Sequence, residues 1–330
     1  MQTTAAYASQ QQGNLSLLVR QIRFEATGIN SYELVHPKGE HLPAFDAGAH
    51  IDVHLKNGVI RQYSLSNAQN ERHRYVIGVL RDEQGRGGSK ALHESLHVQD
   101  IVQVSYPRNN FTLSEQANKV LLLAGGIGVT PLKAMAHALD AAGIPFELHY
   151  CARNAACVAF AEELSRPWHH GTTRFHFDHG KPAQGLDIAG LLRDRSDATH
   201  LYYCGPSGFM QACANAAAHW PADAVHCEYF KAPQTHVTPG DAAAGSFMLK
   251  LNSTGQMIQV SPTSSIADAL KAAGVRIETS CEAGLCGTCK IGFLEGEVDH
   301  RDCILDDGEH QQFLTACVSR ATSPVLVLDL

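Results

Sequence analysis

Four cysteines near the C-terminal end constrain the fold of this chain more than any other feature. Cys281, Cys286 and Cys289 follow the spacing C-x4-C-x2-C, and Cys317 comes after 27 intervening residues. This spacing is typical of the plant-type [2Fe–2S] cluster, in which four thiolates hold two irons. The C-terminal part of the chain is therefore predicted to fold around an iron–sulfur cluster and to carry single electrons.

The residues around these cysteines favour a cluster over structural zinc. Gly284 and Gly287 allow the backbone to turn tightly around an inorganic core and to aim its amides at the sulfurs. Zinc sites usually combine two short C-x2-C pairs, whereas the first gap here has four residues. Structural zinc and ordinary buried thiols are the alternatives. Cys303 is expected to be a small buried residue, because four cysteines already complete the ligand set.

Length and composition predict a globular protein of two or three domains. The chain has 330 residues, of which 44% are hydrophobic and 18% charged, so it can bury several cores. Residues 1–15 lack a basic segment followed by an apolar one, so no secretory signal is expected. The apolar stretch Val120–Val129 is too short to span a bilayer. Thiolate ligands favour the reducing cytoplasm as the location.

The distribution of charge is uneven. The net charge of −7 argues against nucleic-acid binding. Residues 246–330 contain 11 acidic and 6 basic side chains, a net charge of −5, so the remaining residues carry only −2. The acidic C-terminal region is either a surface that attracts a basic redox partner or a solvated face that maintains solubility.

The first region, residues 1–113, contains short apolar runs separated by turns. Its predicted strands are Leu15–Arg23, Ser31–His36, His50–Leu55 and Arg74–Leu80. The stretch Lys56-Asn57-Gly58 is a hairpin turn signal. This pattern predicts a small antiparallel β-barrel.

The second region, residues 114–230, alternates strands with helices. Its predicted strands are Val120–Leu123, Phe146–Cys151, Thr173–Phe177 and His200–Cys204. Its predicted helices are Pro131–Ala142, Phe160–Leu164, Ile188–Leu192 and Gly208–His219. This alternation predicts an α/β domain with a parallel sheet and crossover helices.

The third region is predicted to be a separate α+β domain at residues 246–330. Residues 231–245 are rich in Pro, Thr, Ala and Gly without periodicity, which is typical of a linker. The predicted elements that follow are strands at Phe247–Leu251, Met257–Val260 and Val325–Leu328, and a helix at Ser265–Ala273. Ser264 or Ser265 is the expected N-cap of that helix.

Two loops of the second region are candidates for binding a nucleotide. Gly125, Gly126 and Gly128 join a buried strand to a helix, where a backbone without side chains can approach a pyrophosphate. Glycine also occurs in such turns for packing alone, and Pro131 replaces the last glycine of the usual fingerprint. A second loop, Cys204-Gly205-Pro206, also follows a strand. Cys204 is expected either to line a nicotinamide pocket or to be a small buried residue.

The barrel region contains two motifs suited to a flavin. In Arg61-Gln62-Tyr63-Ser64-Leu65 an arginine, an aromatic ring and a hydroxyl can hold a phosphate and shield one face of the flavin ring. Arg61 and Tyr63 share one face of the predicted strand, so Ser64 reaches the phosphate from the other side or through its backbone. The stretch Arg86-Gly87-Gly88-Ser89 opens a predicted helix at Lys90–Leu96 and offers backbone amides to a phosphate.

The order of these motifs resembles that of the phthalate dioxygenase reductase family, which includes the reductase components of vanillate demethylase and related Rieske oxygenases. The matching stretches cover nearly the whole chain: Arg61–Leu65, Arg86–Ser89, Gly125–Pro131, Cys204–Pro206, Glu228–Phe230 and the four cysteines. Together they are highly specific, although singly only the cysteine spacing is. The resemblance implies an FMN-binding barrel, a pyridine-nucleotide domain and a C-terminal ferredoxin domain.

The resemblance also implies roles for individual residues. FMN would be bound by Arg61, Tyr63, Ser64, Gly87, Gly88 and Ser89. Val79 and Arg81 belong to the strand expected beside the flavin ring, and Thr130 would approach the flavin N5 region. Phe230 would stack where nicotinamide enters, with core packing as the alternative.

A flavin is needed because a hydride carries two electrons and the cluster accepts one at a time. We expect NADH to reduce FMN, FMN to reduce the cluster, and the cluster to reduce the Rieske centre of a terminal oxygenase. The last transfer runs downhill, from about −400 mV to roughly −150 mV or above. NADH is expected rather than NADPH, because Asn154 follows Arg153 where a 2′-phosphate favours a hydroxyl. The protein is expected to be a monomer.

Two other functions compete with this prediction. One is a sulfur- or aldehyde-type oxidoreductase whose ferredoxin domain feeds an internal site, but no molybdenum-type or second cluster motif is present in the sequence. The other is a zinc-stabilised ligand-binding module without electron transfer. A colourless protein would favour the zinc module, whereas flavin and cluster absorbance bleached by NADH would favour the reductase.

Overall fold

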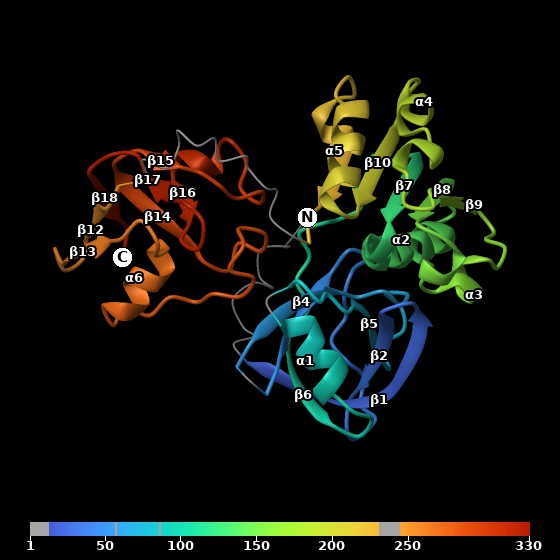
Figure 1. Ribbon diagram of the computed structural model, residues 1–330, viewed down its shortest axis with the longest axis horizontal. Helices are drawn as coiled ribbons and strands as arrows, with labels where there is room; N and C mark the ends of the chain where they lie inside the picture. Colours follow the sequence, from blue (N-terminus) through green and yellow to red (C-terminus); the bar gives the residue numbers. More distant parts are fainter. Residues whose placement is uncertain (1–12, 57, 86, 231–244) are drawn as a thin grey trace, which may run out of the picture. The chain divides into compact units, whose positions relative to one another are not determined.

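The structure is a computed structural model that describes residues 13–56, 58–85, 87–230 and 245–330. It divides into two compact units, Met1–Glu228 and Tyr229–Leu330, each of which is described by itself. Strands β1 to β11 belong to the first unit and β12 to β18 to the second (Figure 1). The predicted boundary at residues 113 and 114 falls inside the first unit. Except for Gly245, the predicted linker lies outside the described residues.

A six-stranded antiparallel barrel forms the first part of unit 1, as the sequence predicted. Its strands are β1 (Asn14–Ala26), β2 (Ile29–Val35), β3 (His50–His54), β4 (Ile60–Ser64), β5 (Tyr75–Leu80) and β6 (Ile101–Ser105). They are ordered β4-β3-β6-β1-β2-β5, and a bridge between Leu65 and Ile77 links the two edge strands. Alternate side chains point inward and form the core. Helix α1 (Gly88–Ser95) contributes Leu92 to that core.

A five-stranded parallel sheet forms the rest of unit 1, again as predicted. Its strands are β7 (Lys119–Gly125), β8 (Phe146–Ala152), β9 (Gly171–Phe177), β10 (Thr199–Cys204) and β11 (Val225–Glu228), in the order β11-β10-β7-β8-β9. Its helices are α2 (Val129–Ala142), α3 (Ala161–Leu164), α4 (Ile188–Leu192) and α5 (Ser207–Ala216). The central strand β7 is a nearly continuous buried run, which is typical of a strand covered on both faces.

Unit 2 is an α+β fold whose main sheet has the order β13-β12-β18-β14-β16. Its elements are β12 (Phe247–Leu251), β13 (Met257–Val260), α6 (Ile266–Ala272), β14 (Lys290–Glu295), β15 (Val298–Asp299), β16 (Phe313–Thr315), β17 (Arg320–Ala321) and β18 (Val325–Leu328). Ser265 caps α6 and forms a capping box with Asp268, so Ser265 is the N-cap. Within the described ranges, no helix is both long and apolar enough to cross a membrane.

Candidate cofactor sites

The four predicted cluster cysteines converge in unit 2. Cys281, Cys286 and Cys289 lie between α6 and β14, and Cys317 follows β16. The Cys281 thiol is a hydrogen-bond partner of Cys286 and Cys317, and Cys317 is also a partner of Cys289. The contact with the Cys286 thiol holds the pKa of Cys281 well below its ordinary value. The contact with the Cys317 thiol likewise lowers the pKa of Cys289. The loop therefore gathers four sulfurs and favours the thiolate form at two of them.

Backbone amides are directed at these sulfurs. Gly284 N donates to Cys317 Sγ at 3.3 Å, and Leu285 N donates to Cys281 Sγ at 3.4 Å. Amides aimed at thiolates stabilise their negative charge, which is what cluster ligands require. The donor set and its amides thus fit a [2Fe–2S] cluster.

Gly284 holds this loop against the segment that follows β15. Its φ is +69°, and a Cβ at this position would stand 2.7 Å from Val318 Cγ2 and 3.0 Å from Asp302 Cα. The Cys303 amide donates to the Gly284 carbonyl at 3.1 Å. Cys303 itself is exposed, so the expectation that it is buried was wrong. The turn therefore holds the backbone of Cys303 against the cluster loop and leaves the Cys303 side chain at the surface.

A candidate phosphate site lies where Arg61 of β4 meets the start of α1. A Cβ on Gly88 would stand 2.6 Å from both Cγ and Nε of Arg61. The N-cap of helix α1 is Gly87, which provides no side-chain cap, and the first turn of the helix contains no acidic residue. A guanidinium beside the positive end of a helix attracts an anion. These residues fit a flavin phosphate, while Arg86 lies outside the described residues.

Tyr63 and Val79 are two further predicted flavin contacts, and they lie on β4 and β5 of the barrel. Tyr63 follows Arg61 on the same face of β4 and is partly buried against the barrel core. Burial raises the pKa of its phenol, so the ring stays neutral. Val79 of β5 is fully buried in the core. Both side chains come from strands that the sequence assigned to flavin binding.

Arg81 and Ser89 make contacts of their own. The Arg81 guanidinium pairs with Glu83 and, at 2.7 Å, with Glu94. The hydroxyl oxygen of Ser89 accepts a hydrogen bond from Asp82 N at 3.0 Å. Arg81 is therefore held by two carboxylates, and Ser89 ties the start of α1 to the end of β5.

The two predicted nucleotide loops press against each other. A Cβ on Gly128 would stand 2.1 Å from the Cys204 carbonyl oxygen. A Cβ on Gly125 or on Gly205 would stand 2.9 Å or 2.7 Å from the Phe209 ring. Three of the glycines are therefore required by packing between the loops.

Gly126 differs from these three glycines. Its φ is +54°, and no atom lies within 4 Å of the position that a Cβ would take. It opens a short turn before α2, a helix of 14 residues with no side-chain cap and no acidic residue in its first turn. Pro206 stands at the corresponding N-cap of α5. This arrangement fits a pyrophosphate at the start of α2.

The three residues predicted to serve hydride transfer lie in different surroundings. Thr130 is 2% exposed, its hydroxyl donates to the Ile127 carbonyl at 3.0 Å, and its Cγ2 faces Gly78 of β5. Cys204 is fully buried, and burial raises the pKa of its thiol. Phe230 is 39% exposed and belongs to unit 2. The structure thus brings Thr130 against the strand expected beside the flavin.

Sequence reasoning assigned no role to Glu228. Its Oε2 accepts a hydrogen bond from the Ser64 hydroxyl at 3.3 Å, and its Oε1 lies 3.9 Å from Nδ1 of the buried His50. Burial raises the pKa of Glu228 to about 8. A carboxyl that titrates near neutral pH beside a predicted flavin contact is a candidate proton carrier. The only hint in the sequence is its place in the stretch Glu228–Phe230.

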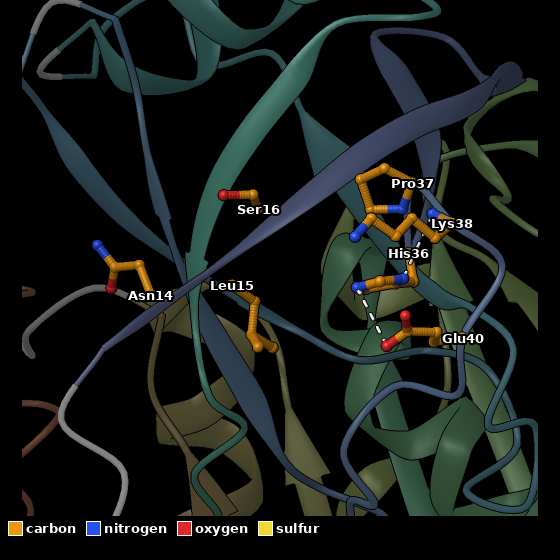
Figure 2. A pocket seen from close by; sticks show the side chains of 7 residues that line it. All are labelled: Asn14, Leu15, Ser16, His36, Pro37, Lys38 and Glu40. Atoms are coloured by element: carbon orange, nitrogen blue, oxygen red, sulfur yellow. Dashed lines mark hydrogen bonds and ion pairs between the residues drawn. The ribbon is translucent and has the colours of Figure 1, made fainter.

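A pocket on the outside of the barrel is separate from these sites (Figure 2). It has a volume of about 330 Å³ and is lined by Asn14, Leu15, Ser16, His36, Pro37, Lys38 and Glu40. His36 accepts a hydrogen bond from Lys38 N at 3.3 Å, and its Nε2 lies 3.8 Å from Glu40. None of the predicted cofactor residues lines this pocket.

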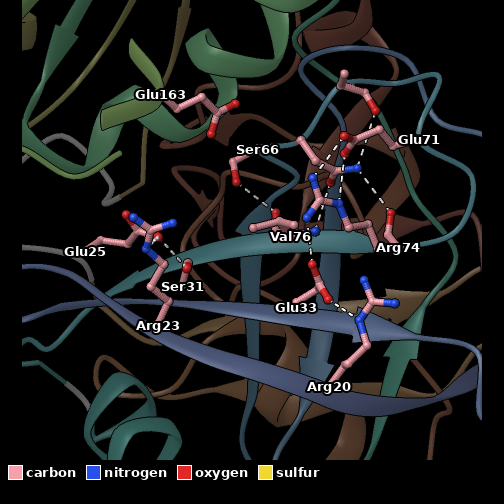
Figure 3. A network of polar contacts seen from close by, with 12 residues as sticks. Arg20, Arg23, Glu25, Ser31, Glu33, Ser66, Glu71, Arg74, Val76 and Glu163 are labelled. Carbon is pink, nitrogen blue, oxygen red and sulfur yellow. Dashed lines mark hydrogen bonds and ion pairs between the residues drawn. The ribbon is translucent and has the colours of Figure 1, made fainter. Parts of the chain in front are cut away.

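A polar network joins the barrel to the parallel sheet within unit 1. Lys133 of α2 is buried, and its Nζ donates to the Ser66 carbonyl at 2.9 Å and lies 2.8 Å from Glu163. Figure 3 shows Arg74 of the barrel bound to Glu33, at 2.7 Å, beside this junction. These contacts hold the barrel and the parallel sheet of unit 1 together.

Comparisons with known proteins agree with this description. Residues 122–215 match the family described as "Oxidoreductase NAD-binding domain", and residues 249–322 match "2Fe-2S iron-sulfur cluster binding domain". The chain is similar to the tert-butanol monooxygenase / tert-amyl alcohol desaturase reductase subunit of Aquincola tertiaricarbonis, with 51% identity over 96% of each chain. It is 46% identical to a vanillate O-demethylase oxidoreductase of Pseudomonas sp. (strain HR199 / DSM 7063), over 96% of this chain and all of that one.

A solved structure has the same architecture. Phthalate dioxygenase reductase, described as a modular structure for electron transfer from pyridine nucleotides to [2Fe-2S], is similar with a TM-score of 0.73 and 40% identity. The match covers 96% of this chain and 98% of that one.

The fold and the matched families define an oxidoreductase that transfers electrons and combines an NAD-binding sheet with a [2Fe–2S] unit. The chain belongs to the phthalate dioxygenase reductase family. Membership bears out the predicted fold class and the predicted set of FMN, pyridine nucleotide and [2Fe–2S] cluster.

Proposed function

We propose that this protein is the NADH-dependent reductase component of a two-component Rieske-type oxygenase or demethylase. The observation that most supports this proposal is that one chain contains two kinds of site. One is a loop of four cysteines with backbone amides directed at their sulfurs. The other is the start of helix α1, which has no side-chain cap and lies against Arg61. The first suits a one-electron centre and the second a flavin phosphate.

In the proposed flavin site, Arg61 supplies charge to the FMN phosphate at the first turn of α1. Backbone amides of Gly87, Gly88 and Ser89 complete this phosphate site. Tyr63 shields one face of the ring, and Val79 and Arg81 line the strand beside it. Because Arg81 is held by Glu83 and Glu94, it fixes that strand rather than binding phosphate.

In the proposed nucleotide site, Gly126 and the start of α2 bind the pyrophosphate of NADH. Gly125, Gly128, Gly205 and Pro206 shape the two loops around it. Thr130 and Cys204 border the place where nicotinamide meets the flavin. Thr130 is anchored for this role by its hydrogen bond to Ile127 and its contact with β5.

Bound flavin converts the two electrons of a hydride into the single electrons that a cluster accepts. The chain's own part includes handling a proton. Ser64 Oγ donates to Glu228 Oε2, and a carboxyl with a pKa of about 8 gains and loses a proton near neutral pH. Passing both electrons of a hydride on to a one-electron centre would leave one proton at the flavin, and Ser64 and Glu228 would carry that proton away.

The proposed partner is a terminal Rieske non-haem iron oxygenase, in line with relatives named as reductase subunits of oxygenase systems. Residues 246–330 carry a net charge of −5, which suits docking to a basic surface near the partner's iron centre. We further propose that the protein acts as a monomer in the cytoplasm and favours NADH over NADPH.

Replacing the ligand Cys286 with serine tests the proposed order of transfer. In anaerobic single-turnover experiments, Cys286→Ser should leave the rate of flavin bleaching by NADH within about twofold, since binding and hydride transfer occur in unit 1. NADH-driven reduction of cytochrome c, a one-electron acceptor, should fall by about 100-fold or more because the outlet is lost.

The matched control is Cys303→Ser, an exposed cysteine of the same unit, which should keep both rates. Circular dichroism checks that each variant is folded. Loss of flavin reduction in a folded Cys286→Ser protein would refute the proposed order, as would undiminished reduction of cytochrome c.

A further inference from the structure

Two histidines and one aspartate outside the cysteine quartet form a cluster in unit 2. His300 and Asp302 follow β15, and His310 lies in the turn before β16. The rings of His300 and His310 stack with centroids 4.1 Å apart. One ligand atom from each of the three residues lies within 4.8 Å of the other two. Within the described parts of the chain, this is the only such group outside the cysteine quartet.

The local backbone provides hydrogen-bond partners for only one of the two oxygens of the Asp302 carboxylate. Its Oδ1 accepts hydrogen bonds from Ile304 N at 3.2 Å and from Leu305 N at 2.9 Å, which shapes the turn. Its Oδ2 is buried with no hydrogen-bond partner, and the Asp302 side chain is 0% exposed. His310 Nε2 lies 3.4 Å away in ion-pair range.

Three buried polar atoms of this cluster lack a hydrogen-bond partner. His300 Nδ1 and His310 Nε2 are, like Asp302 Oδ2, buried without a hydrogen-bond partner. Burying a polar atom without a hydrogen-bond partner is unfavourable, so three such atoms together call for a shared partner. A cation bound to all three would satisfy them at once.

We propose that His300, Asp302 and His310 form a second metal site, which binds a divalent transition-metal ion such as Zn²⁺. Two imidazole nitrogens and one carboxylate oxygen are the donors that such ions prefer, and water fills the remaining positions. Zn–N and Zn–O bonds are about 2.0–2.2 Å long, so ligand atoms on one ion lie closer together than 4.8 Å. Binding therefore draws the two rings inward toward Asp302.

The site connects directly to the cluster loop. The Cys303 amide, next to Asp302, donates to the Gly284 carbonyl, and the Gly284 amide donates to Cys317 Sγ at 3.3 Å. An ion held by Asp302 would brace this loop and add positive charge near the cluster. Bound Zn²⁺ should therefore raise the reduction potential of the cluster, because positive charge favours the reduced state. This effect goes beyond the proposed function and does not depend on the identity of the oxygenase.

The test uses the full-length protein with its flavin and cluster in place. After mild chelation, equilibrium dialysis with Zn²⁺ should show one tightly bound zinc per chain with no loss of iron. X-ray absorption at the zinc edge should show nitrogen and oxygen at about 2.0–2.1 Å and no sulfur at about 2.3 Å. A sulfur shell would mean that zinc had entered the cysteine loop and would overturn the proposal.

Variants assign the ligands. His300→Gln and His310→Gln should each weaken Zn²⁺ binding by at least tenfold. Asp302→Asn should do the same while keeping Oδ1 for the turn, so it provides a readout if a histidine variant loses its cluster. His97→Ala, at an exposed position in the barrel, is the matched control and should bind zinc like the parent.

Electron paramagnetic resonance during a redox titration supplies an independent readout. Zinc should raise the cluster potential in the parent protein and in His97→Ala but not in Asp302→Asn. Zinc binding of unchanged strength in all three site variants would overturn the proposal. So would the absence of a stoichiometric zinc in the parent.

Discussion

The cluster loop of unit 2 and the nucleotide turn of unit 1 are both rich in glycine, yet their glycines meet different needs. In the cluster loop, Gly284 combines a positive φ with a close approach to Val318, and the ligands are side chains. In the nucleotide turn, Gly128 is needed because the turn touches the Cys204 carbonyl, and only Gly126 has open space beside it. A glycine motif in a sequence thus reports loop-on-loop packing as much as ligand contact.

The largest expected effect separates packing from ligand contact in unit 1. A Cβ added by Gly128→Ala would stand 2.1 Å from the Cys204 carbonyl oxygen, and backbone on both sides must move. We expect a loss of about 3 kcal/mol in the free energy of unfolding, the upper part of the range for overpacking. Urea denaturation followed by circular dichroism measures it.

The paired variant is Gly126→Ala, whose φ of +54° costs an alanine about 1–2 kcal/mol without a clash. It should be the more stable variant of the two and should still weaken NADH binding, because the new methyl occupies the space proposed for the pyrophosphate. If Gly126→Ala destabilises the protein as much as Gly128→Ala, the contrast between the two glycines is wrong.

Much of the fold follows from local patterns in the sequence. The period of apolar residues placed α4 and β12 at their observed ends, and Ser265 was predictable as an N-cap because Asp268 completes a capping box. The four cysteines were predictable because side-chain ligands need a fixed number and spacing. Strand β6 was not predicted, although Val102 and Val104 alternate with exposed residues, because five residues give a weak signal.

The next largest expected effect concerns the glycines of the cluster loop in unit 2. In Gly284→Ala the new Cβ would stand 2.7 Å from Val318 Cγ2, and the positive φ adds backbone strain. We therefore expect the free energy of unfolding to fall by about 2 kcal/mol and the bound iron to fall several-fold. Gly287 has nearly the same φ, +70°, but its nearest neighbour, Ile304 Cγ1, is 3.8 Å away. Gly287→Ala should therefore keep more of its cluster.

Iron and sulfide analysis, with the visible absorbance of the cluster, distinguishes the two variants. Equal losses in both would show that backbone conformation alone governs the cluster loop. The contrast in packing between Gly284 and Gly287 would then have no consequence.

Long-range contacts explain what the sequence did not reveal. Glu228 meets Ser64 across 164 positions, and it is burial in the folded chain that makes its carboxyl unusual. Cys303 was expected to be a small buried residue because four cysteines already complete the ligand set, but it lies on a surface turn. The spacing of His300, Asp302 and His310 matches no common metal-ligand motif. The three residues meet only because the turn before β16 brings His310 back to the other two.

The smallest expected effect concerns Glu228, the ionisable side chain that contacts Ser64 in unit 1. Burial raises the pKa of Glu228 from 4.5 to about 8, so the folded state favours the neutral acid. Below pH 4.5 the carboxyl is protonated in both the folded and the unfolded chain, and its contribution to stability is complete. Between pH 4.5 and 8 the unfolded chain ionises first, so stability falls as pH rises.

Glu228→Gln removes this titration and keeps the shape of the side chain. The free energy of unfolding of the parent, relative to Glu228→Gln, should drop by about 1 kcal/mol between pH 6 and pH 7, close to the limit of about 1.4 kcal/mol per pH unit for one proton. Urea denaturation at a series of pH values measures the difference, with the exposed Glu115→Gln as the matched control. A pH-independent difference would mean that Glu228 is ionised in the folded protein, and the proton route through Ser64 would lose its carrier.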